Sequence, residues 1–398
     1  MNIRTLDDIE IRNKRVAIRV DLNVPLNGTE VANDERIRAI LPTLKLCRDR
    51  GAEVVLLSHL GRPDGAQDSR FSLQPVATRL SQLLDLPVKL VAEWRATYLN
   101  SGLSKRVRPG EISILENVRF ESGEKKNDQE LGREFASIGE IYVMDAFGTA
   151  HRAHASTNAA IECAEVACAG PLLIQEIQTI ERALKDPKRP LIAVIGGSKI
   201  SGKLEVLHHL SKLADSILVG GGMANTFLLA HGHQLGQSLV EPDLAGEARS
   251  IASAAKVPLP VDVMTSNGIS SSSIATLRRC KDVHQHETIV DIGPNTARMY
   301  ASMIRKAATV LWNGPMGVFE FDQFGEGTRV VAEAIADTSA MTIAGGGDTI
   351  AALDRNGLRS EIDYVSTGGG AFLNLVEGKE LPSLTALEKH ASRTLAVD

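Results

Sequence analysis

The chain has 398 residues, of which 43% are hydrophobic and 23% charged, and its formal net charge is −5. This length supports two ordinary domains, each with its own hydrophobic core. The acidic balance argues against a nucleic-acid coat or a membrane-surface protein, because both usually need a basic excess. No apolar stretch reaches the roughly 18 residues of a membrane span, so we expect no membrane association.

The four cysteines, Cys47, Cys163, Cys168 and Cys280, show neither a CxxC pair nor a regular spacing. A disulfide framework or a structural zinc site is therefore not expected, and a reducing compartment suits the chain better. Residues 1–15 carry many charges and lack the apolar region of a signal peptide. We expect a cytoplasmic protein.

Short apolar runs alternate with segments of helical period along the chain. Segments 35–51 and 74–85 have apolar residues three and four apart, as amphipathic helices do. The predicted strands are Arg15–Val20, Glu53–Ser58, Ile112–Glu116, Ile141–Met144, Leu191–Ile195, Ser216–Val219, Thr309–Trp312, Met341–Ala344 and Tyr364–Ser366. Strand followed by helix, repeated, predicts an α/β fold with parallel sheets and helices on both faces.

A helix near the middle of the chain is expected to connect two domains. Apolar residues from Leu173 to Leu184 lie on one face of this helix, which begins near Pro171 and stops before Pro187. We place the domains at 1–170 and 171–380, the second beginning with the interdomain helix 172–185.

Ligands bind at the carboxyl ends of the strands in open parallel sheets. In the first half of the chain these ends carry RVDLN (19–23), SHLGRP (58–63), ENVRF (116–120) and DAFGTAHRAH (145–154). Planar guanidinium groups bind phosphate and carboxylate oxygens in pairs. Arg62, Arg119 and Arg152, with His59 and His151, therefore predict a site for a small anion. One such arginine would more simply be a solvated surface charge, but four strand ends share the pattern.

The second half carries glycine-rich turns after its strands: GGSKISGK (196–203), GGGMANT (220–226), NGPMG (313–317), AGGGDT (344–349) and STGGGA (366–371). Backbone N–H groups at such turns point at phosphates, and the following helix adds positive potential. This half predicts a nucleotide site, with Asp348 as a ligand for Mg²⁺ on the phosphates. The alternative, glycines that only make tight turns, is disfavoured because three GGG turns occur.

Two other patterns are assigned no function. The turn from Gly197 to Lys203 satisfies part of a P-loop, but Leu204 stands where that motif needs a hydroxyl group for Mg²⁺. The remaining histidines lack partner ligands at metal spacing, so we expect them to be solvated or in the core: His208, His209, His231, His233, His284 and His286.

Seven motifs occur in order along the chain: RVDLNVPL, SHLGRP, LENVRF, DAFGTAHRAH, WNGPMGVFE, GGGDT and STGGGAFL. With them the chain resembles the phosphoglycerate kinase family from about Arg15 to about Leu387. The resemblance implies two Rossmann-like domains that face each other across a hinged cleft. It also implies a monomer that moves a phosphoryl group reversibly between 1,3-bisphosphoglycerate and Mg-ADP, by direct in-line transfer on domain closure, to give 3-phosphoglycerate and Mg-ATP.

The resemblance further implies roles for individual residues. The phosphoglycerate site would comprise Asp21, Asn23, Arg36, His59, Leu60, Gly61, Arg62, Arg119, His151 and Arg152. The nucleotide site would comprise Lys203, Gly293, Glu320, Gly346, Gly347, Asp348 and Thr349, with Glu320 near the ribose and Asp348 on the metal. Arg36, Lys199 and Gly369 would be catalytic, and the C-terminal segment 381–398 would return to the N-terminal domain.

The chain departs from the family pattern in three places. Gly202 stands where an acidic residue usually precedes the second lysine, which leaves the rigidity of that turn open. HQHET (284–288) replaces a longer segment with proline and glycine, so the base pocket is expected to differ. A polar tail, Ala391–Asp398, extends past the usual end.

Two alternative functions remain to be weighed. A dinucleotide-dependent dehydrogenase would need GxGxxG after its first strand and an acid about 20 residues later, and no glycine turn here has that spacing. A regulatory protein that binds nucleotide without turnover would not need Lys199, Lys203 and Asp348 together. A phosphotransferase with a carboxyl group as acceptor is the favoured function.

Overall fold

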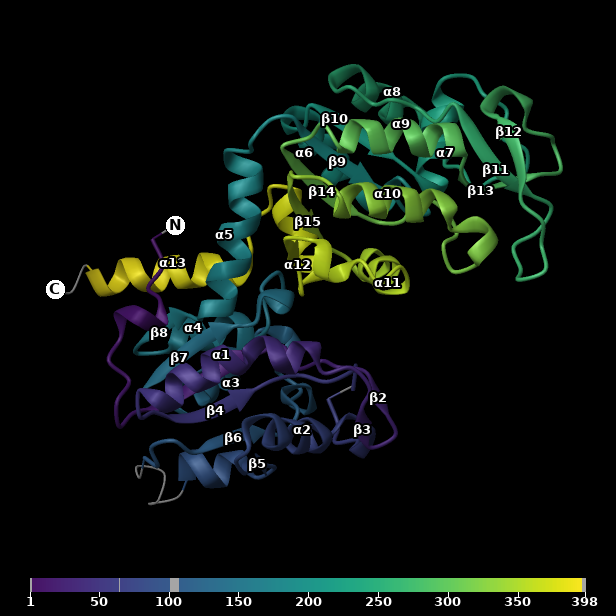
Figure 1. Ribbon diagram of the computed structural model, residues 1–398. Coiled ribbons are helices and arrows are strands. Elements are labelled where there is room, and N and C mark those ends of the chain that lie inside the picture. The colour runs from purple at the N-terminus through teal and green to yellow at the C-terminus, as the bar shows by residue number, and fades with distance from the viewer. Residues whose placement is uncertain (1, 64, 101–106, 396–398) are drawn as a thin grey trace. The chain divides into compact units, whose positions relative to one another are not determined.

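The computed structural model describes residues 2–63, 65–100 and 107–395 (Figure 1). The chain divides into two compact units: unit 1 is Met1–Gln178 with Glu380–Asp398, and unit 2 is Thr179–Lys379. The division falls inside helix α5 (Pro171–Lys185), at the position where apolar periodicity predicts a helix. The chain therefore leaves unit 1 through α5 and re-enters it at Glu380.

Unit 1 is built on a six-stranded sheet of order β5-β6-β4-β1-β7-β8 in which every neighbouring pair is parallel. Its strands are β1 (Arg15–Val20), β4 (Glu53–Leu57), β5 (Val88–Val91), β6 (Ile112–Leu115), β7 (Ile141–Asp145) and β8 (Ala167–Ala169), with a separate hairpin of β2 (Leu26–Asn27) and β3 (Glu30–Val31). Its helices are α1 (Glu35–Asp49), α2 (Gln74–Leu84), α3 (Gln129–Ala136), α4 (Ala160–Cys163) and α13 (Pro382–Leu395). Strands β1 and β4 are buried throughout, as expected for a parallel sheet covered on both faces.

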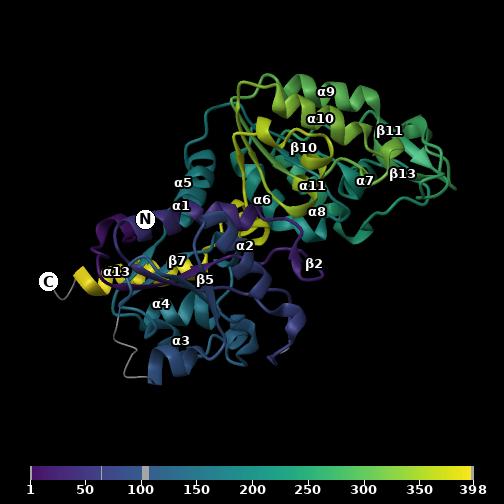
Figure 2. The ribbon, with the colours of Figure 1, turned by 60° about the horizontal axis from the view of Figure 1, so that its bottom comes forward.

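Unit 2 holds a five-stranded parallel sheet of order β10-β9-β14-β15-β16 and a three-stranded antiparallel sheet of order β12-β11-β13. The strands are β9 (Leu191–Ile195), β10 (Ser216–Val219), β11 (Asp262–Ser266), β12 (Thr276–Arg279), β13 (Thr288–Ile292), β14 (Thr309–Asn313), β15 (Met341–Ala344) and β16 (Tyr364–Val365). The helices are α6 (Leu204–Leu213), α7 (Gly221–Ala230), α8 (Ala245–Ala254), α9 (Pro294–Ile304), α10 (Glu326–Ala336), α11 (Gly347–Arg355) and α12 (Gly369–Val376). Helices α9 and α10 lie side by side in both views (Figures 1 and 2).

Helix α13 packs on unit 1 against α4 and β8 (Figure 1). The Ser383 hydroxyl donates to the Thr157 carbonyl at 2.6 Å, and His390 Nε2 lies 3.0 Å from the Ala164 carbonyl oxygen. Leu384 and Leu387, at helical spacing, are 7% and 2% exposed. Burial of this apolar face attaches the end of the chain to unit 1.

All nine predicted strands are present, and each has its ends within one residue of the prediction. The prediction omitted β5 and β8, which are short, and the whole antiparallel sheet of unit 2. Strands β11 and β12 read DVMTS and TLRR, so they lack the continuous apolar run that marks a buried parallel strand. Among the described helices, none is both long and apolar enough to cross a membrane.

The packing of α13 predicts the effect of a core truncation. Leu387→Ala should lower the free energy of unfolding of unit 1 by about 2 to 5 kcal/mol, because it leaves a cavity beneath α13. The control is Lys389→Ala, since Lys389 is exposed on the same helix. Urea unfolding should be followed by the fluorescence of Trp94, which lies in unit 1, in a common Trp312→Phe background. Equal midpoints for the two variants would contradict the packing role of Leu387.

Candidate functional site

Each parallel sheet has one place where the direction of its strand connections reverses. In unit 1 the reversal lies at β1, since β4 is its neighbour on one side and β7 on the other. A crevice opens outside the carboxyl ends of strands at such a reversal. Asp21 and Asn23 follow β1, and His151 and Arg152 follow β7. Four of the predicted anion-binding residues thus follow the two strands at the reversal.

Asp21, Asn23 and Arg36 form one hydrogen-bonded group. Arg36 Nη1 lies 3.3 Å from the Asp21 carboxylate and donates to the Asn23 carbonyl at 2.8 Å. The Asn23 side-chain oxygen accepts from the Gly61 N–H at 2.8 Å. Gly61 has a φ of +62°, which favours glycine, and Leu60 beside it is buried. The loops after β1 and β4 and the start of α1 are joined in this way.

Arg119 extends this group from the loop after β6. Its Nη1 donates to the Gly61 carbonyl. The neighbouring Asn117 side chain donates to the Leu60 carbonyl at 2.7 Å and so shapes the loop that Arg119 contacts. Arg119 Nε is buried and has no hydrogen-bond partner among the described residues. A buried donor without a partner costs free energy, so this atom is available to a ligand oxygen.

A buried arginine that the sequence analysis did not select lies beneath His59. Arg19 is 1% exposed, and its Nη2 lies 3.3 Å from His59 Nδ1. A guanidinium group cannot accept a hydrogen bond, so Nδ1 accepts and the ring proton is on Nε2. Arg19 Nε donates to the Ser156 hydroxyl at 2.8 Å, and this hydroxyl donates to the buried Glu124 at 2.6 Å. All six residues of β1 are buried, Arg15 and Arg19 included, so the strand pattern alone does not set Arg19 apart.

The electrostatics show how close the cationic groups of unit 1 lie. Burial, together with the charges of Arg19, Arg119, Arg152 and Arg36, holds the pKa of His59 well below 6.5. Burial and then the charges of Arg152 and Arg19 lower the pKa of Arg119 to about 10. Burial likewise lowers the pKa of Arg152, Asp21 opposes this, and Arg19, Arg62 and Arg36 lower it further. The arginines named in these pKa shifts lie close to one another and are called the arginine cluster: Arg19, Arg36, Arg62, Arg119 and Arg152.

The histidines of the DAFGTAHRAH turn are held neutral beside the arginine cluster. Burial and the Arg152 charge lower the pKa of His151, whose Nε2 accepts from Arg152 Nε at 3.2 Å. Burial and the nearby arginines lower the pKa of His154, also not selected from the sequence, to about 4. Arg62 is exposed and forms no hydrogen bond or ion pair within the described part of the chain. Cationic forks and neutral ring N–H groups suit a polyanionic ligand.

In unit 2 the strand connections reverse between β9 and β14, and Lys203 marks that place. Its Nζ donates to the carbonyls of Gly196 at 2.6 Å and Asn313 at 3.0 Å, which lie at the ends of these strands. Burial lowers the pKa of Lys203 to about 8, and the Asp348 charge opposes this shift. The structure therefore brings Lys203 and Asp348 into electrostatic contact at the carboxyl edge of the sheet.

The turn from Gly346 to Thr349 lies next to this lysine. The Thr349 hydroxyl donates to the Gly345 carbonyl at 2.9 Å and accepts from the Gly314 N–H at 2.7 Å. Gly346 has a φ of +99°, and a Cβ there would lie 2.6 Å from Asn313 Nδ2, so only glycine fits. A Cβ on Gly369 would lie 3.7 Å from Gly346 Cα, so the first turns of α11 and α12 adjoin. Two helix N-termini beside a lysine form a positive region that suits phosphate groups.

Three predicted residues lie outside these contacts. Lys199 is exposed, and its charge helps to lower the pKa of Glu241 after the larger effect of hydrogen bonds from Ser201. Glu320 is exposed, and Gly293 caps α9 with its N–H bonded to the Asp262 carbonyl at 2.9 Å. Among the described hydrogen bonds and ion pairs, none joins these three residues to Lys203 or Asp348.

Glu241 stabilises the turn that contains Gly202, whose rigidity the sequence analysis left open. The Glu241 carboxylate accepts from the Ser201 N–H at 2.9 Å and from the Ser201 hydroxyl at 2.6 Å. A Cβ on Gly202 would meet nothing within 4 Å, so no packing constraint requires glycine there. The turn between Lys199 and Lys203 is therefore fixed by hydrogen bonds to Glu241, which belongs to a separate segment of the chain.

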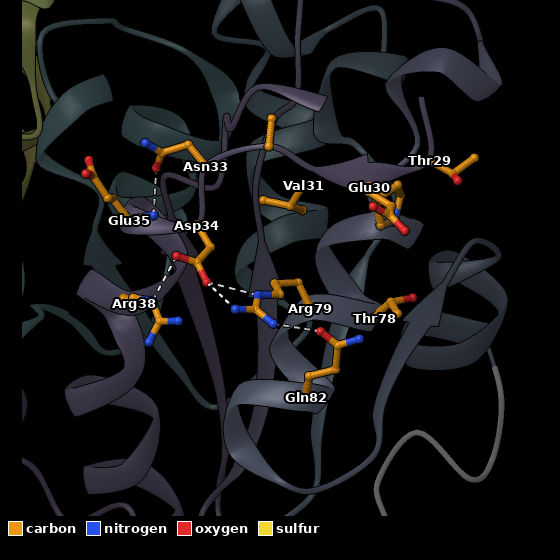
Figure 3. A pocket seen from close by; sticks show the side chains of 12 residues that line it. Thr29, Glu30, Val31, Asn33, Asp34, Glu35, Arg38, Thr78, Arg79 and Gln82 are labelled. Carbon is orange, nitrogen blue, oxygen red and sulfur yellow. Dashed lines mark hydrogen bonds and ion pairs between the residues drawn. The ribbon is translucent and has the colours of Figure 1, made fainter. Parts of the chain in front are cut away.

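The wide groove of unit 1 shown in Figure 3 contains none of the predicted site residues. It has a volume of about 790 Å³ and lies between the β2–β3 hairpin, the start of α1 and α2. Asp34 pairs with both of its arginines, Arg38 at 2.8 Å and Arg79 at 2.6 Å. Glu30 and Glu35 also line the groove, so three carboxylates face two guanidinium groups, and the groove is a poor anion site despite its size.

The sequence analysis was wrong about one pair of histidines. It expected them to lack partner ligands, whereas the structure brings single ligand atoms of His284, His286 and Glu287 within 4.8 Å of one another. The carboxylate belongs to the residue that follows the HxH pair, so it was present in the sequence but not counted as a partner.

Comparison with known proteins identifies the family. A family model for phosphoglycerate kinase matches residues 6–379. The solved phosphoglycerate kinase from Coxiella burnetii is 44% identical, with a TM-score of 0.91 over 98% of this chain and 100% of that chain. That from Pyrococcus horikoshii OT3 is 32% identical, with a TM-score of 0.81 over 98% and 100%. The chain belongs to the phosphoglycerate kinase family.

Membership of the phosphoglycerate kinase family confirms the resemblance drawn from the seven motifs. It also confirms the predicted α/β fold with two Rossmann-like sheets. The chain is thus a kinase and a transferase of a glycolytic family. The structure adds five residues to the site regions that the sequence analysis did not select: Arg19, Glu124, His154, Ser156 and Glu241.

The contact between Arg19 and His59 predicts a fixed tautomer. At pH 6.5, where a free imidazole is half protonated, His59 should be neutral with its proton on Nε2, because burial disfavours the imidazolium form and Arg19 donates to Nδ1. Nitrogen-15 NMR of histidine-labelled protein, with His59→Gln to assign the signal, would measure this. A protonation midpoint near 6.5, or a proton on Nδ1, would contradict it.

Proposed function

We propose that this protein catalyses the reversible transfer of a phosphoryl group between 1,3-bisphosphoglycerate and Mg-ADP, giving 3-phosphoglycerate and Mg-ATP. Family membership supports the reaction class. The observation that carries the proposal is the pair of unlike sites at the two strand reversals: an arginine cluster in unit 1, and a lysine with helix N-termini in unit 2. One suits a small polyanion, and the other suits a chain of phosphates.

In unit 1 the arginine cluster binds the phosphoglycerate. Its members repel one another, and Asp21 and Glu124 oppose the charges. A ligand with carboxylate and phosphate groups relieves this repulsion, and the buried Arg119 Nε then gains a partner. His59 and His151 donate ring N–H groups to the anion, and Arg36 lies where β1 and α1 meet. We assign Arg36 to the reacting end of the substrate.

In unit 2 Lys203 and the Gly346–Thr349 turn bind the nucleotide phosphates, while Gly293 and Glu320 contact the nucleoside. The Val318 N–H donates to the Val290 carbonyl at 2.8 Å, so the segment of Glu320 runs beside the strand that leads to Gly293. Asp348 is exposed and has no hydrogen bond or ion pair among the described residues, which fits a carboxylate that holds Mg²⁺. The cation, when bound with the nucleotide, neutralises phosphate charge.

The reaction needs no nucleophile from the protein, because phosphoryl transfer passes through a loose transition state that requires alignment and charge stabilisation. Lys199 and the α12 N-terminus at Gly369 stabilise the phosphoryl group in flight. We assign no general base, since neither a carboxylate nor a phosphate oxygen has a proton to lose at neutral pH. Direct in-line transfer requires the two bound substrates to meet, so domain closure is part of the proposal.

Two further expectations belong to the proposal. The protein works as a monomer, because each substrate site is complete within one chain. It acts in the cytoplasm, since the free cysteines suit a reducing compartment and the net charge of −5 suits neither nucleic acid nor an anionic membrane as a partner.

The activity can be tested by coupling 3-phosphoglycerate and Mg-ATP to the reduction of 1,3-bisphosphoglycerate by NADH. The wild-type protein should turn over. Asp348→Asn should keep the fold and its affinity for metal-free ADP but lose most of the gain in rate on Mg²⁺ addition, because an amide is a poor ligand for a hard cation. Turnover that is absent from the wild type, or equal in both proteins, would contradict the proposal.

The two lysines should respond differently to removal. Lys199→Ala should lower kcat by roughly 10²-fold to 10³-fold, about 3 to 4 kcal/mol, with little change in either KM, because Lys199 acts mainly in the transition state. Lys203→Ala should chiefly raise the KM for nucleotide, because it holds phosphates throughout. Steady-state kinetics of both variants side by side would measure this, and indistinguishable variants would overturn the assignment of Lys199.

A further inference from the structure

The turn His284–Glu287 in unit 2 is part of HQHET (284–288), the segment expected to alter the base pocket, but none of its residues is among those assigned to either substrate. Its Glu287 N–H donates to the His284 carbonyl at 3.1 Å, which closes a tight turn before β13. His284, Gln285 and His286 are exposed, whereas Glu287 is 4% exposed. The two imidazole rings lie with their centroids 5.6 Å apart. The turn thus presents two histidines to solvent above one buried carboxylate.

A neighbouring segment holds the backbone of this turn. The Gln237 N–H donates to the Glu287 carbonyl at 2.8 Å, and the Ile289 N–H donates to the Ser238 hydroxyl at 2.8 Å. A Cβ on Gly236 would lie 2.3 Å from the His284 carbonyl oxygen, so the two segments are in close contact. Because the backbone is anchored on both sides, the protein chain would lose little conformational entropy when a ligand binds between the two rings.

The Glu287 carboxylate is ionised and fixed. Arg278 on β12 donates to it through Nη2 at 2.8 Å, and the His284 N–H donates at 3.1 Å. His284 Nδ1 lies 3.9 Å from Glu287 Oε1. A negative charge therefore stands beside the two imidazoles at the surface.

We infer that His284, His286 and Glu287 form a binding site for one divalent cation of the zinc class. Imidazole nitrogen and carboxylate oxygen are zinc ligands, and three protein ligands leave one position for water. In a tetrahedral site, ligand atoms at about 2.1 Å from the metal lie about 3.4 Å from one another. In the structure these ligand atoms lie within 4.8 Å of one another. Small rotations of the two exposed histidine side chains bring them to the tetrahedral spacing. Mg²⁺ is excluded because it prefers all-oxygen octahedral sites.

Arg278 tunes this site. Its guanidinium group competes with the cation for the Glu287 oxygens and adds a positive charge beside the metal. We therefore expect a dissociation constant in the micromolar range, which means weaker binding than at a closed four-ligand zinc site. None of its residues is among those assigned to phosphoryl transfer, and the titration below is done without nucleotide so that the cation site is measured by itself.

Calorimetric titration of Zn²⁺ into the metal-free protein, without nucleotide, tests the inference. One cation should bind per chain. His284→Ala and His286→Ala should each weaken binding at least tenfold without changing the fold, because both side chains are exposed. The controls are His231→Ala and His233→Ala, a second HxH pair for which no carboxylate completes a ligand set among the described residues. These should bind Zn²⁺ like the wild type. Absent binding in the wild type, or equal binding in all five proteins, would overturn the site.

Arg278→Gln tests the third ligand separately. Removal of the competing cation should tighten Zn²⁺ binding about threefold or more if Glu287 contacts the metal, because its carboxylate becomes available. Unchanged or weaker binding would overturn the assignment of Glu287. As a second readout, Zn²⁺ should raise the Tm of the wild type and of the His231 and His233 variants but leave that of His284→Ala unchanged.

Discussion

The site regions of this protein depend on one constraint: every strand within each of its two main sheets runs in the same direction. Parallel strands bring the residues that follow them to one edge, whatever their separation in sequence. This is how Asn23, Gly61 and Arg119, each from a different loop, come to share hydrogen bonds. The same constraint lets Lys203 bridge the ends of β9 and β14. The reversal of strand connections decides which part of the edge is open to a ligand.

The two edges solve the problem of binding anions in different ways. Unit 1 gathers guanidinium groups, and burial, followed by the charges of Arg152 and Arg19, lowers the pKa of Arg119 to about 10. Unit 2 has one half-buried amine and the N–H groups of two helix starts, which carry partial charges and need little desolvation. Guanidinium forks bind carboxylate and phosphate oxygens in pairs, whereas backbone N–H groups donate to the phosphate oxygens of any ester. The two arrangements match the two ligands of the proposed function, a small polyanion and a nucleotide.

The parts of the fold that depend on local pattern were predictable from the sequence. Strands such as β9 and β14 are continuous apolar runs, and α5 shows helical periodicity between two prolines. The antiparallel sheet was missed because β11 and β12 mix polar and apolar residues in no regular alternation. The strand ends also led to Arg62, Arg119 and Arg152, which the structure brings near one another, while their role in binding stays a prediction. Arg19 was missed because a buried charge inside a strand is recognised only when its partners His59 and Ser156 are in place. The Glu241–Ser201 contact joins residues 40 positions apart, which no local pattern encodes.

Helix α13 has a consequence for how the protein is made. Unit 1 is a discontinuous domain, because its last helix is encoded after the whole of unit 2. As the chain leaves the ribosome, residues 2–178 emerge early, but the apolar surface that receives Leu384 and Leu387 stays open until α13 has been synthesised. Unit 2, a single continuous segment, has all its residues before then. The first unit to be synthesised is therefore the last to be completed, and its unfinished surface must avoid aggregation while the ribosome reads about 200 more codons.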